Sequence, residues 1–147
     1  MAVYIKQSLF EPFSEVAQHQ LQLEANIGKG QYGASTIFIG SMRDFNEACD
    51  VSAMTLEYYP GMTESALKSI ANEAKEKWPI LDTLIVHRVG DIQPNDSIVL
   101  VAVWSAHRAA AYEANRYIME ALKSRAPFWK KETTSSGGRW VEKNTPA

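Results

Sequence analysis

The sequence predicts an α+β domain in which helices pack on a mostly antiparallel sheet. Three stretches carry apolar residues at helical spacing, and they alternate with stretches rich in β-branched and apolar residues. Residues 97–104 are almost continuously apolar, which is typical of a central strand. The resulting order is β-α-β-β-α-β-β-α-β-β. The 147 residues fit one domain, 1–147, large enough to bury a core without a metal or a disulfide.

The first strand and the first helix are expected at the N-terminus. Residues 3–7 are typical of a short strand. Residues 12–23 predict a helix, in which Pro12 suits the first turn. The apolar residues that recur there at roughly helical spacing are Phe13, Val16, Ala17, Leu21 and Leu23. Two glycines within residues 28–30 then break the chain.

Two strands separated by a loop are expected next. Residues 33–40 are rich in β-branched and apolar side chains and predict a buried strand. Residues 43–50 are polar and predict a loop. Residues 51–59 alternate well enough for a strand, which ends at Pro60 and Gly61.

The second helix is expected over residues 63–78, where Thr63 can cap it and Glu64 is favourably placed in its first turn. Its apolar stripe consists of Ala66, Leu67, Ile70, Ala71, Ala74 and Trp78. Pro79 ends this helix. Residues 81–89 predict a strand, and residues 90–96 a turn.

The C-terminal part completes the sheet with a helix and two strands. A third helix is expected over residues 106–125 and is ended by Pro127. Its buried stripe should be Ala110, Ala114, Tyr117, Ile118, Ala121 and Leu122. Residues 128–132 and 139–143 predict a final pair of strands.

Composition and charge exclude several classes of protein. The formal net charge of −2 argues against a general nucleic-acid binder. No apolar run approaches the roughly 20 residues that span a bilayer, and the N-terminus lacks a signal-peptide pattern, so we expect a cytoplasmic protein. Cys49 is the only cysteine, and three scattered histidines do not make a metal site.

The charge is unevenly distributed along the chain. Residues 1–122 carry 9 basic and 15 acidic side chains, whereas residues 123–147 carry 6 basic and 2 acidic ones. A basic end on an acidic body indicates a local anion site or a docking face for an acidic partner.

One candidate site is the tetrapeptide Ser-Ala-His-Arg at residues 105–108, where a buried strand leads into a helix. Free backbone N–H groups and the helix dipole favour an anion at such a position. Arg108 adds a two-pronged donor suited to phosphate. A capping serine followed by two solvated side chains is the alternative interpretation.

A second candidate site spans residues 123–131. Lys123 lies in the last helical turn, where a cation is favourable in any case. Because Pro127 turns the chain, Lys130 could return to the neighbourhood of Lys123. Neighbouring cations lower a lysine pKa, and a neutral amine is a nucleophile or base, whereas a charged one stabilises an oxyanion or a phosphate. Phe128 and Trp129 could form a stacking wall for a flat heterocycle or belong to the core, which is the favoured interpretation for Trp129.

Other motifs give weaker indications of a functional site. Arg43 follows a strand end and could be a second anion clamp or a surface charge. Residues 28–33 match G-x-G-x-x-G by letters, but they lead into a strand rather than a helix, so a flexible turn is favoured. His87 and Arg88 are interpreted as an outward-facing pair on a strand. His19 is interpreted as a solvated residue on a helix surface.

Several segments, in one order, resemble the large subunit of molybdopterin synthase. The most specific pair is Ser-Ala-His-Arg at residues 105–108 with Lys-x-Arg-Ala-Pro-Phe-Trp-Lys at residues 123–130. Gly-Ser-Met-Arg at residues 40–43, Leu-Glu-Tyr-Tyr-Pro-Gly-Met at 56–62, His-Arg-Val-Gly at 87–90 and Gly-Arg-Trp-Val-Glu at 138–142 add to it. The resemblance covers most of the chain.

The resemblance implies an α/β hammerhead-like fold with a small additional β subdomain. It also implies a sulfurtransferase that converts cyclic pyranopterin monophosphate (precursor Z) into molybdopterin, with no metal or organic cofactor needed for the transfer. Sulfur would arrive as a thiocarboxylate on the C-terminal glycine of a small ubiquitin-like subunit. The large subunits would form a central homodimer, with one small subunit on each outer end of a heterotetramer.

The same resemblance implies roles for individual residues. The catalytic lysine falls on Lys123 and the second active-site lysine on Lys130. The substrate-binding residues fall on Arg43, His107 and Arg108, and further pocket or interface residues are Phe38, Met119 and Arg139. A non-catalytic domain that docks an acidic ubiquitin-like partner is the alternative, although docking alone does not require this combination of residues.

Overall fold

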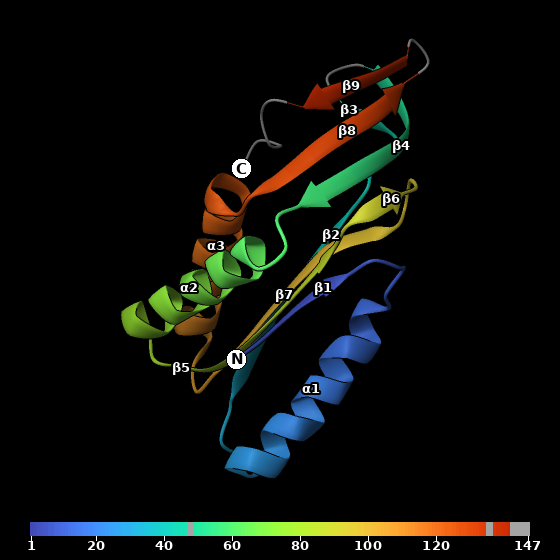
Figure 1. Ribbon diagram of the computed structural model, residues 1–147. Coiled ribbons are helices and arrows are strands. Elements are labelled where there is room, and N and C mark those ends of the chain that lie inside the picture. The colour runs from blue at the N-terminus through green and yellow to red at the C-terminus, as the bar shows by residue number, and fades with distance from the viewer. Residues whose placement is uncertain (47–48, 135–136, 142–147) are drawn as a thin grey trace.

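Two β-sheets and three helices make up the computed structural model, which describes residues 1–46, 49–134 and 137–141 (Figure 1). The elements are β1 (Ala2–Lys6), α1 (Pro12–Ile27), β2 (Ala34–Ser41), β3 (Phe45–Asn46), β4 (Cys49–Tyr58), α2 (Met62–Lys77), β5 (Ile80–Arg88), β6 (Gly90–Ile92), β7 (Ser97–Ser105), α3 (Arg108–Arg125), β8 (Phe128–Thr134) and β9 (Gly137–Val141). Among the described residues, no helix combines the length and the apolar character needed to cross a bilayer.

The first sheet has the strand order β1-β5-β7-β2. Only the β1–β5 pair is parallel, whereas β5–β7 and β7–β2 are antiparallel. The predicted α+β class with a mostly antiparallel sheet is therefore confirmed, and so is the central position of the apolar strand, β7.

Helices cover both faces of this sheet, which explains why β7 is apolar without alternation. α2 and α3 lie on one face, where alternate residues such as Ile85, Val101 and Val103 join their core. α1 lies on the opposite face, where Leu84, Leu100 and Trp104 are buried (Figure 1). Successive side chains of a strand point to opposite faces, so both sets must be buried.

The second sheet is the additional β subdomain. Its order is β3-β4-β8-β9, and β6 also pairs with β4. Two of its strands correct the sequence expectations. β3 lies within the predicted loop 43–50, and β6 lies within the predicted turn 90–96. Both strands are too short to show a strand pattern in the sequence. They form because each pairs with β4.

Helix α1 forms where expected, but its buried face differs from the apolar set that indicated it. Phe13 and Leu21 are 68% and 69% exposed, and the buried residues are Pro12, Val16, His19 and Leu23. The interpretation of His19 as solvated was wrong, because the stripe that faces the sheet passes through it.

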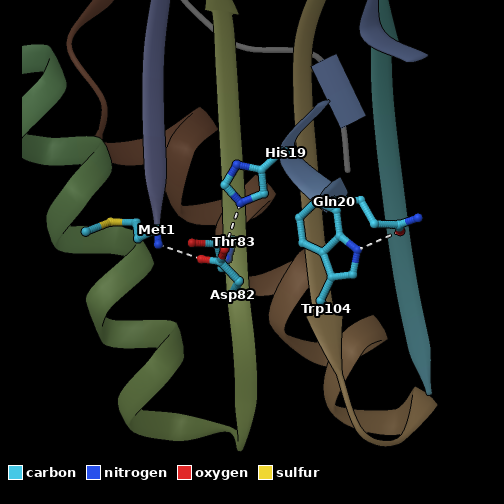
Figure 2. Close-up of polar contacts among 6 residues, drawn as sticks. All are labelled: Met1, His19, Gln20, Asp82, Thr83 and Trp104. Carbon is cyan, nitrogen blue, oxygen red and sulfur yellow. Dashed lines mark hydrogen bonds and ion pairs between the residues drawn. The ribbon is translucent and has the colours of Figure 1, made fainter. Parts of the chain in front are cut away.

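The His19 side chain is held by partners from β5 and β7 (Figure 2). Its Nε2 lies 2.7 Å from Oδ2 of Asp82, and its ring lies 5.2 Å from the ring of Trp104. The Trp104 indole N–H donates to Oε1 of Gln20 at 3.0 Å. Asp82 also accepts from the Met1 ammonium and from the Thr83 amide. These polar contacts attach α1 to the sheet.

Replacing Asp82 by asparagine should lower the free energy of unfolding by about 2 kcal/mol at pH 7. Burial would raise the pKa of Asp82, but hydrogen bonds from His19, the terminal ammonium and the Thr83 amide lower it to about 2. The stability that the carboxylate contributes is complete above its unfolded pKa of 3.8 and is lost as the pH falls through about 2. Urea unfolding of both proteins at pH 7 measures this, with exposed Glu76→Gln as the control. Equal losses in the two variants would contradict the role of Asp82.

Candidate functional site

The site is built on the turn between α3 and β8. Lys123 lies in the last turn of α3, and the helix ends at Ala126, whose backbone is extended because a proline follows. β8 then runs back along β4, which places Lys130 near Lys123. The two lysines line the same pockets, as the position of Pro127 predicts.

The second helix holds this turn in place. The fully buried Thr63 hydroxyl donates to the Pro127 carbonyl at 3.0 Å and accepts from the Tyr59 amide at 3.0 Å. Thr63 was predicted to cap α2, but Gly61 takes that position. Glu73 of α2 binds the Arg125 guanidinium through both carboxylate oxygens, at 2.8 and 2.6 Å. The end of α3 is therefore fixed relative to α2.

Lys123 and Lys130 open into a pocket of about 410 Å³. The pocket is lined by Phe38, Gly40, Ser41, Arg43, Ile98, Val99, Lys123 and Lys130. Arg43 reaches it from the loop after β2, which is anchored by backbone hydrogen bonds of Met42 with Asn95 and Asp96. At Gly40, a Cβ atom would lie 2.8 Å from a methyl carbon of Val99, so this wall has no room for a side chain. The structure thus brings Arg43, Phe38 and both lysines together.

The cations of this pocket influence each other. Burial, and then the charge of Lys130, lowers the pKa of Lys123 from 10.5 to about 8. Burial also lowers the pKa of Lys130, where Glu132 opposes the shift and Arg43 adds to it. Near neutral pH, Lys123 is therefore a cation with an accessible neutral form, suited to proton transfer or nucleophilic attack.

His87 belongs to the site, although sequence reasoning assigned it to an exposed strand face. It is 2% exposed, and together with Lys123 and Lys130 it lines a second cavity of about 30 Å³. Arg88 is also buried, with its Nη2 donating to the Asp91 carbonyl at 2.6 Å. One signal could have indicated that His87 and Arg88 are buried. Both residues lie in a strand next to the apolar central strand, and helices cover both faces of this sheet.

A groove continues from the lysine pocket across the surface between β2 and α3. Its volume is about 640 Å³, and Phe38 belongs to both the groove and the lysine pocket. Met119 lines this groove, together with the aromatic ring of Tyr112 and the guanidinium-bearing Arg116. The structure therefore places Met119 beside the site rather than in the lysine pocket.

His107 and Arg108 lie at the opposite end of α3. His107 is the N-cap of this helix, and both side chains are exposed. Because an α-helix rises about 1.5 Å per residue, the sixteen positions from His107 to Lys123 span about 24 Å. Ser105 does not cap the helix, since its hydroxyl donates to the carbonyl of His107. Within one chain, the two most specific motifs are not brought together.

The two remaining candidates have different outcomes. Trp129 was favoured as a core residue, but it is 44% exposed and packs against Tyr59 at a ring distance of 5.4 Å. It lies between Phe128 and Lys130 on β8, and alternation points it away from the pocket.

The Arg139 side chain lies outside the described part of the structure. Among the described residues, no cluster of histidine, cysteine and carboxylate groups could hold a metal ion.

Replacing Lys123 by methionine should increase the free energy of unfolding by about 2 kcal/mol at pH 7. The pKa of Lys123 is about 8 when folded and 10.5 in its ordinary state, so the unfolded chain binds more protons between these values. The penalty of burying the charge is complete below pH 8 and disappears as the pH rises to 10.5. Urea unfolding at pH 7 and pH 10 measures the difference, with exposed Lys68→Met as the control. A Lys123→Met protein less stable than the control at pH 7 would refute this.

Comparisons with known proteins identify chains that are similar in sequence and fold. The family model described as MoaE protein matches residues 12–125. The molybdopterin synthase catalytic subunit of Pseudomonas aeruginosa is 48% identical over 142 residues, which cover 97% of this chain and 91% of that protein. The protein of the same name from Ralstonia nicotianae is 54% identical over 115 residues, which cover 78% of this chain and 65% of that protein. A solved MoaE protein from Burkholderia ambifaria is 45% identical, with a TM-score of 0.80, and covers 100% of this chain and 93% of that chain.

Proposed function

This chain belongs to the MoaE protein family, and we propose that it is the catalytic large subunit of a molybdopterin synthase. It would transfer sulfur from the C-terminal thiocarboxylate of a small ubiquitin-like subunit to cyclic pyranopterin monophosphate, and two such transfers would complete the dithiolene of molybdopterin. Residues 1–147 act as one large-subunit domain in this proposal. The names of the relatives support the reaction.

The observation that carries the proposal is the shared pocket of Lys123, Lys130 and Arg43. A thiocarboxylate tail and a cyclic phosphate are both anions, and both require a cationic pocket. A pocket that only bound anions would not need a buried lysine with a pKa of about 8. This pKa suits a group that gives up and regains a proton during the transfer.

Lys123 acts as the nucleophile or as the acid–base group of the transfer, with Lys130 beside it. As an ammonium, Lys123 can stabilise negative charge on the oxygen and sulfur of the reacting thiocarboxylate and can donate a proton. As an amine, it can accept a proton, or it can attack the thiocarboxylate carbon after the sulfur has bonded to the substrate, so that the bond between carbon and sulfur breaks and the sulfur stays on the substrate. Lys130 and Arg43 remain cationic partners for the two anions.

The substrate would lie in the groove between β2 and α3 that Phe38 and Met119 line. A flat heterocycle favours the apolar and aromatic side chains there, and its phosphate favours guanidinium groups. Arg43 would hold the phosphate from the side of the lysines. Arg139 is proposed as a further pocket or interface residue on the resemblance alone.

His107 and Arg108 would complete the pocket of a second copy of the chain. About 24 Å of helix separates them from Lys123 in their own chain, which is too far for one small substrate to bridge. In the central homodimer that the family resemblance implies, one chain can place them at the lysines of the other. We place this homodimer in a heterotetramer with two small subunits, acting in the cytoplasm and without a metal or organic cofactor.

A reconstitution assay tests the function. The purified protein is mixed with a thiocarboxylated ubiquitin-like subunit and cyclic pyranopterin monophosphate, and the dithiolene product is followed by mass spectrometry. Product formation supports the synthase. A tight complex that forms no product, with a small subunit of proven competence, supports the non-catalytic docking domain instead.

A further inference from the structure

Arg88 is a buried cation to which the proposed function assigns no task. It ends β5 and is 7% exposed. Its Nη2 donates to the Asp91 carbonyl at 2.6 Å, and its Nη1 lies 3.6 Å from Oδ2 of Asp96. Among the described residues, its Nε and Nη1 have no hydrogen-bond partner. Burying an incompletely paired guanidinium costs free energy that an apolar side chain would avoid, so stability alone does not explain an arginine at this position.

The turn that Arg88 faces lies between β6 and β7, at residues 93–96. The Gln93 amide donates to Oδ2 of Asp96 at 3.0 Å, and the Asp96 amide donates to the Gln93 carbonyl at 3.0 Å. Asn95 has a φ of 76°, which is uncommon for a residue other than glycine. The Asp96 carboxylate therefore holds the turn closed, and Arg88 supplies a positive charge that faces this carboxylate from β5.

The loop after β2 is attached to the same turn. The Met42 amide donates to the Asp96 carbonyl, and the Asn95 amide donates to the Met42 carbonyl, both at 2.9 Å. The Met42 side chain is buried in one cluster with Ile92 of β6. The next residue along the chain is Arg43, whose side chain lines the lysine pocket. The position of the turn thus determines where the Arg43 side chain starts.

Arg88 can influence the pocket only through this path. In the described part of the chain, the two cavities that the lysines line are formed without Arg88. The interactions of the Arg43 side chain itself determine its direction, whereas the turn determines the place of its backbone. A shift of the turn would therefore move Arg43 relative to Lys123 and Lys130.

We propose that Arg88 is a positioning residue, which holds the turn at residues 93–96 and through it the backbone of Met42, so that Arg43 reaches the phosphate of the substrate. The role of Arg43 toward the phosphate rests on the proposed function, whereas the attachment of the loop to the turn does not. Because Arg43 binds the substrate and the lysines carry out the transfer, loss of Arg88 should weaken substrate binding and leave the chemical step nearly unchanged.

The first test compares Arg88→Met with Arg88→Lys. Methionine retains an apolar chain but has no charge, whereas lysine retains a cation that can donate. In the full synthase, with saturating thiocarboxylated small subunit, Arg88→Met should raise the KM for cyclic pyranopterin monophosphate about tenfold, the effect of one charged hydrogen bond, with little change in kcat. Arg88→Lys should recover part of this loss. Val16→Ala, which removes buried atoms from α1, is the control for lost stability and should leave KM unchanged.

A double variant shows whether Arg88 acts through Arg43. Arg43→Ala should raise KM at least as much as Arg88→Met does, and adding Arg88→Met to Arg43→Ala should raise it no further. If the two effects multiply, to a rise of about a hundredfold, Arg88 acts independently of Arg43 and the proposal is wrong. An unchanged KM in Arg88→Met would overturn it as well.

Amide hydrogen exchange in the free protein tests the attachment of the loop without substrate. In Arg88→Met, the Met42 and Asn95 amides should exchange about tenfold faster relative to the amides of the central strand β7. Equal acceleration of all amides would show that Arg88 only stabilises the fold, and would refute the proposal.

Asp96→Asn provides the same test if Arg88→Met does not fold. Asparagine retains an oxygen for the Gln93 amide and removes only the charge that Arg88 faces. The Met42 and Asn95 amides should again exchange faster than those of β7, and unchanged relative exchange would contradict the proposal. A wild-type protein without turnover would refute the function alone, because the exchange measurement does not depend on the reaction.

Discussion

Replacement of Lys123 by alanine should reduce product formation in a single-turnover assay by about a thousandfold or more. Two contributions disappear together, because the ammonium stabilises developing negative charge and the amine transfers a proton. Each contribution is worth about a hundredfold or more in enzymes where it has been isolated. The assay uses saturating thiocarboxylated small subunit, so that a change in docking affinity does not affect the result.

Matched variants separate the chemistry from folding and docking. Lys68→Ala removes a lysine from the exposed face of α2 and should retain normal turnover. We expect Lys123→Ala to bind the small subunit with little loss, since the substitution removes a single side chain that lines the pocket. Near-normal turnover of Lys123→Ala would show that another group carries the reaction, and loss of docking in parallel with turnover would show that Lys123 serves binding of the small subunit and not the chemical step.

Mixing two inactive variants should restore activity if each pocket is completed by a second copy. Lys123→Ala and Arg108→Ala are each expected to be almost inactive as homodimers. When they are unfolded together and refolded, half of the dimers combine one chain of each kind. Each mixed dimer then has one pocket with both native residues and one with neither, so about a quarter of the wild-type activity should return.

The control for this experiment places both changes in one chain. A protein with Lys123→Ala and Arg108→Ala, mixed with wild-type chains, retains one native residue in each pocket of a mixed dimer and should add no activity. If Arg108 instead served the pocket of its own chain, the mixture of single variants would stay inactive. That outcome would require a substrate contact that bridges the length of α3.

Local sequence patterns were sufficient for the main elements. The three helices form where the apolar spacing predicts them, and α3 ends before Pro127 as expected. These features depend on neighbours three or four positions apart, which a sequence shows directly. The return of Lys130 to Lys123 was also predicted, from the turn at Pro127, and in the structure the pairing of β8 with β4 sets the direction of the strand after that turn. Family membership was also predicted from the motifs and is confirmed.

The errors about the burial of single residues have one cause in common. His19, His87 and Arg88 were interpreted as exposed because they are polar, and Trp129 as buried because it is large and apolar. The burial of His87 follows from helices on both faces of the first sheet, and the exposure of Trp129 follows from the pairing of β8 with β4. Such long-range packing overrides the preference of a single residue.

By itself, the sequence determined the class of the fold, the family and the pairing of Lys123 with Lys130, because each depends on local order along the chain. Tertiary structure alone decided three further features. It brought Arg43 and Phe38 into the lysine pocket through the β2–β7 pairing, it buried His87 beneath that pocket, and it separated His107 and Arg108 from it by the length of a helix. These outcomes depend on strand register and layer packing, which connect residues distant in sequence and leave no periodic pattern in either segment.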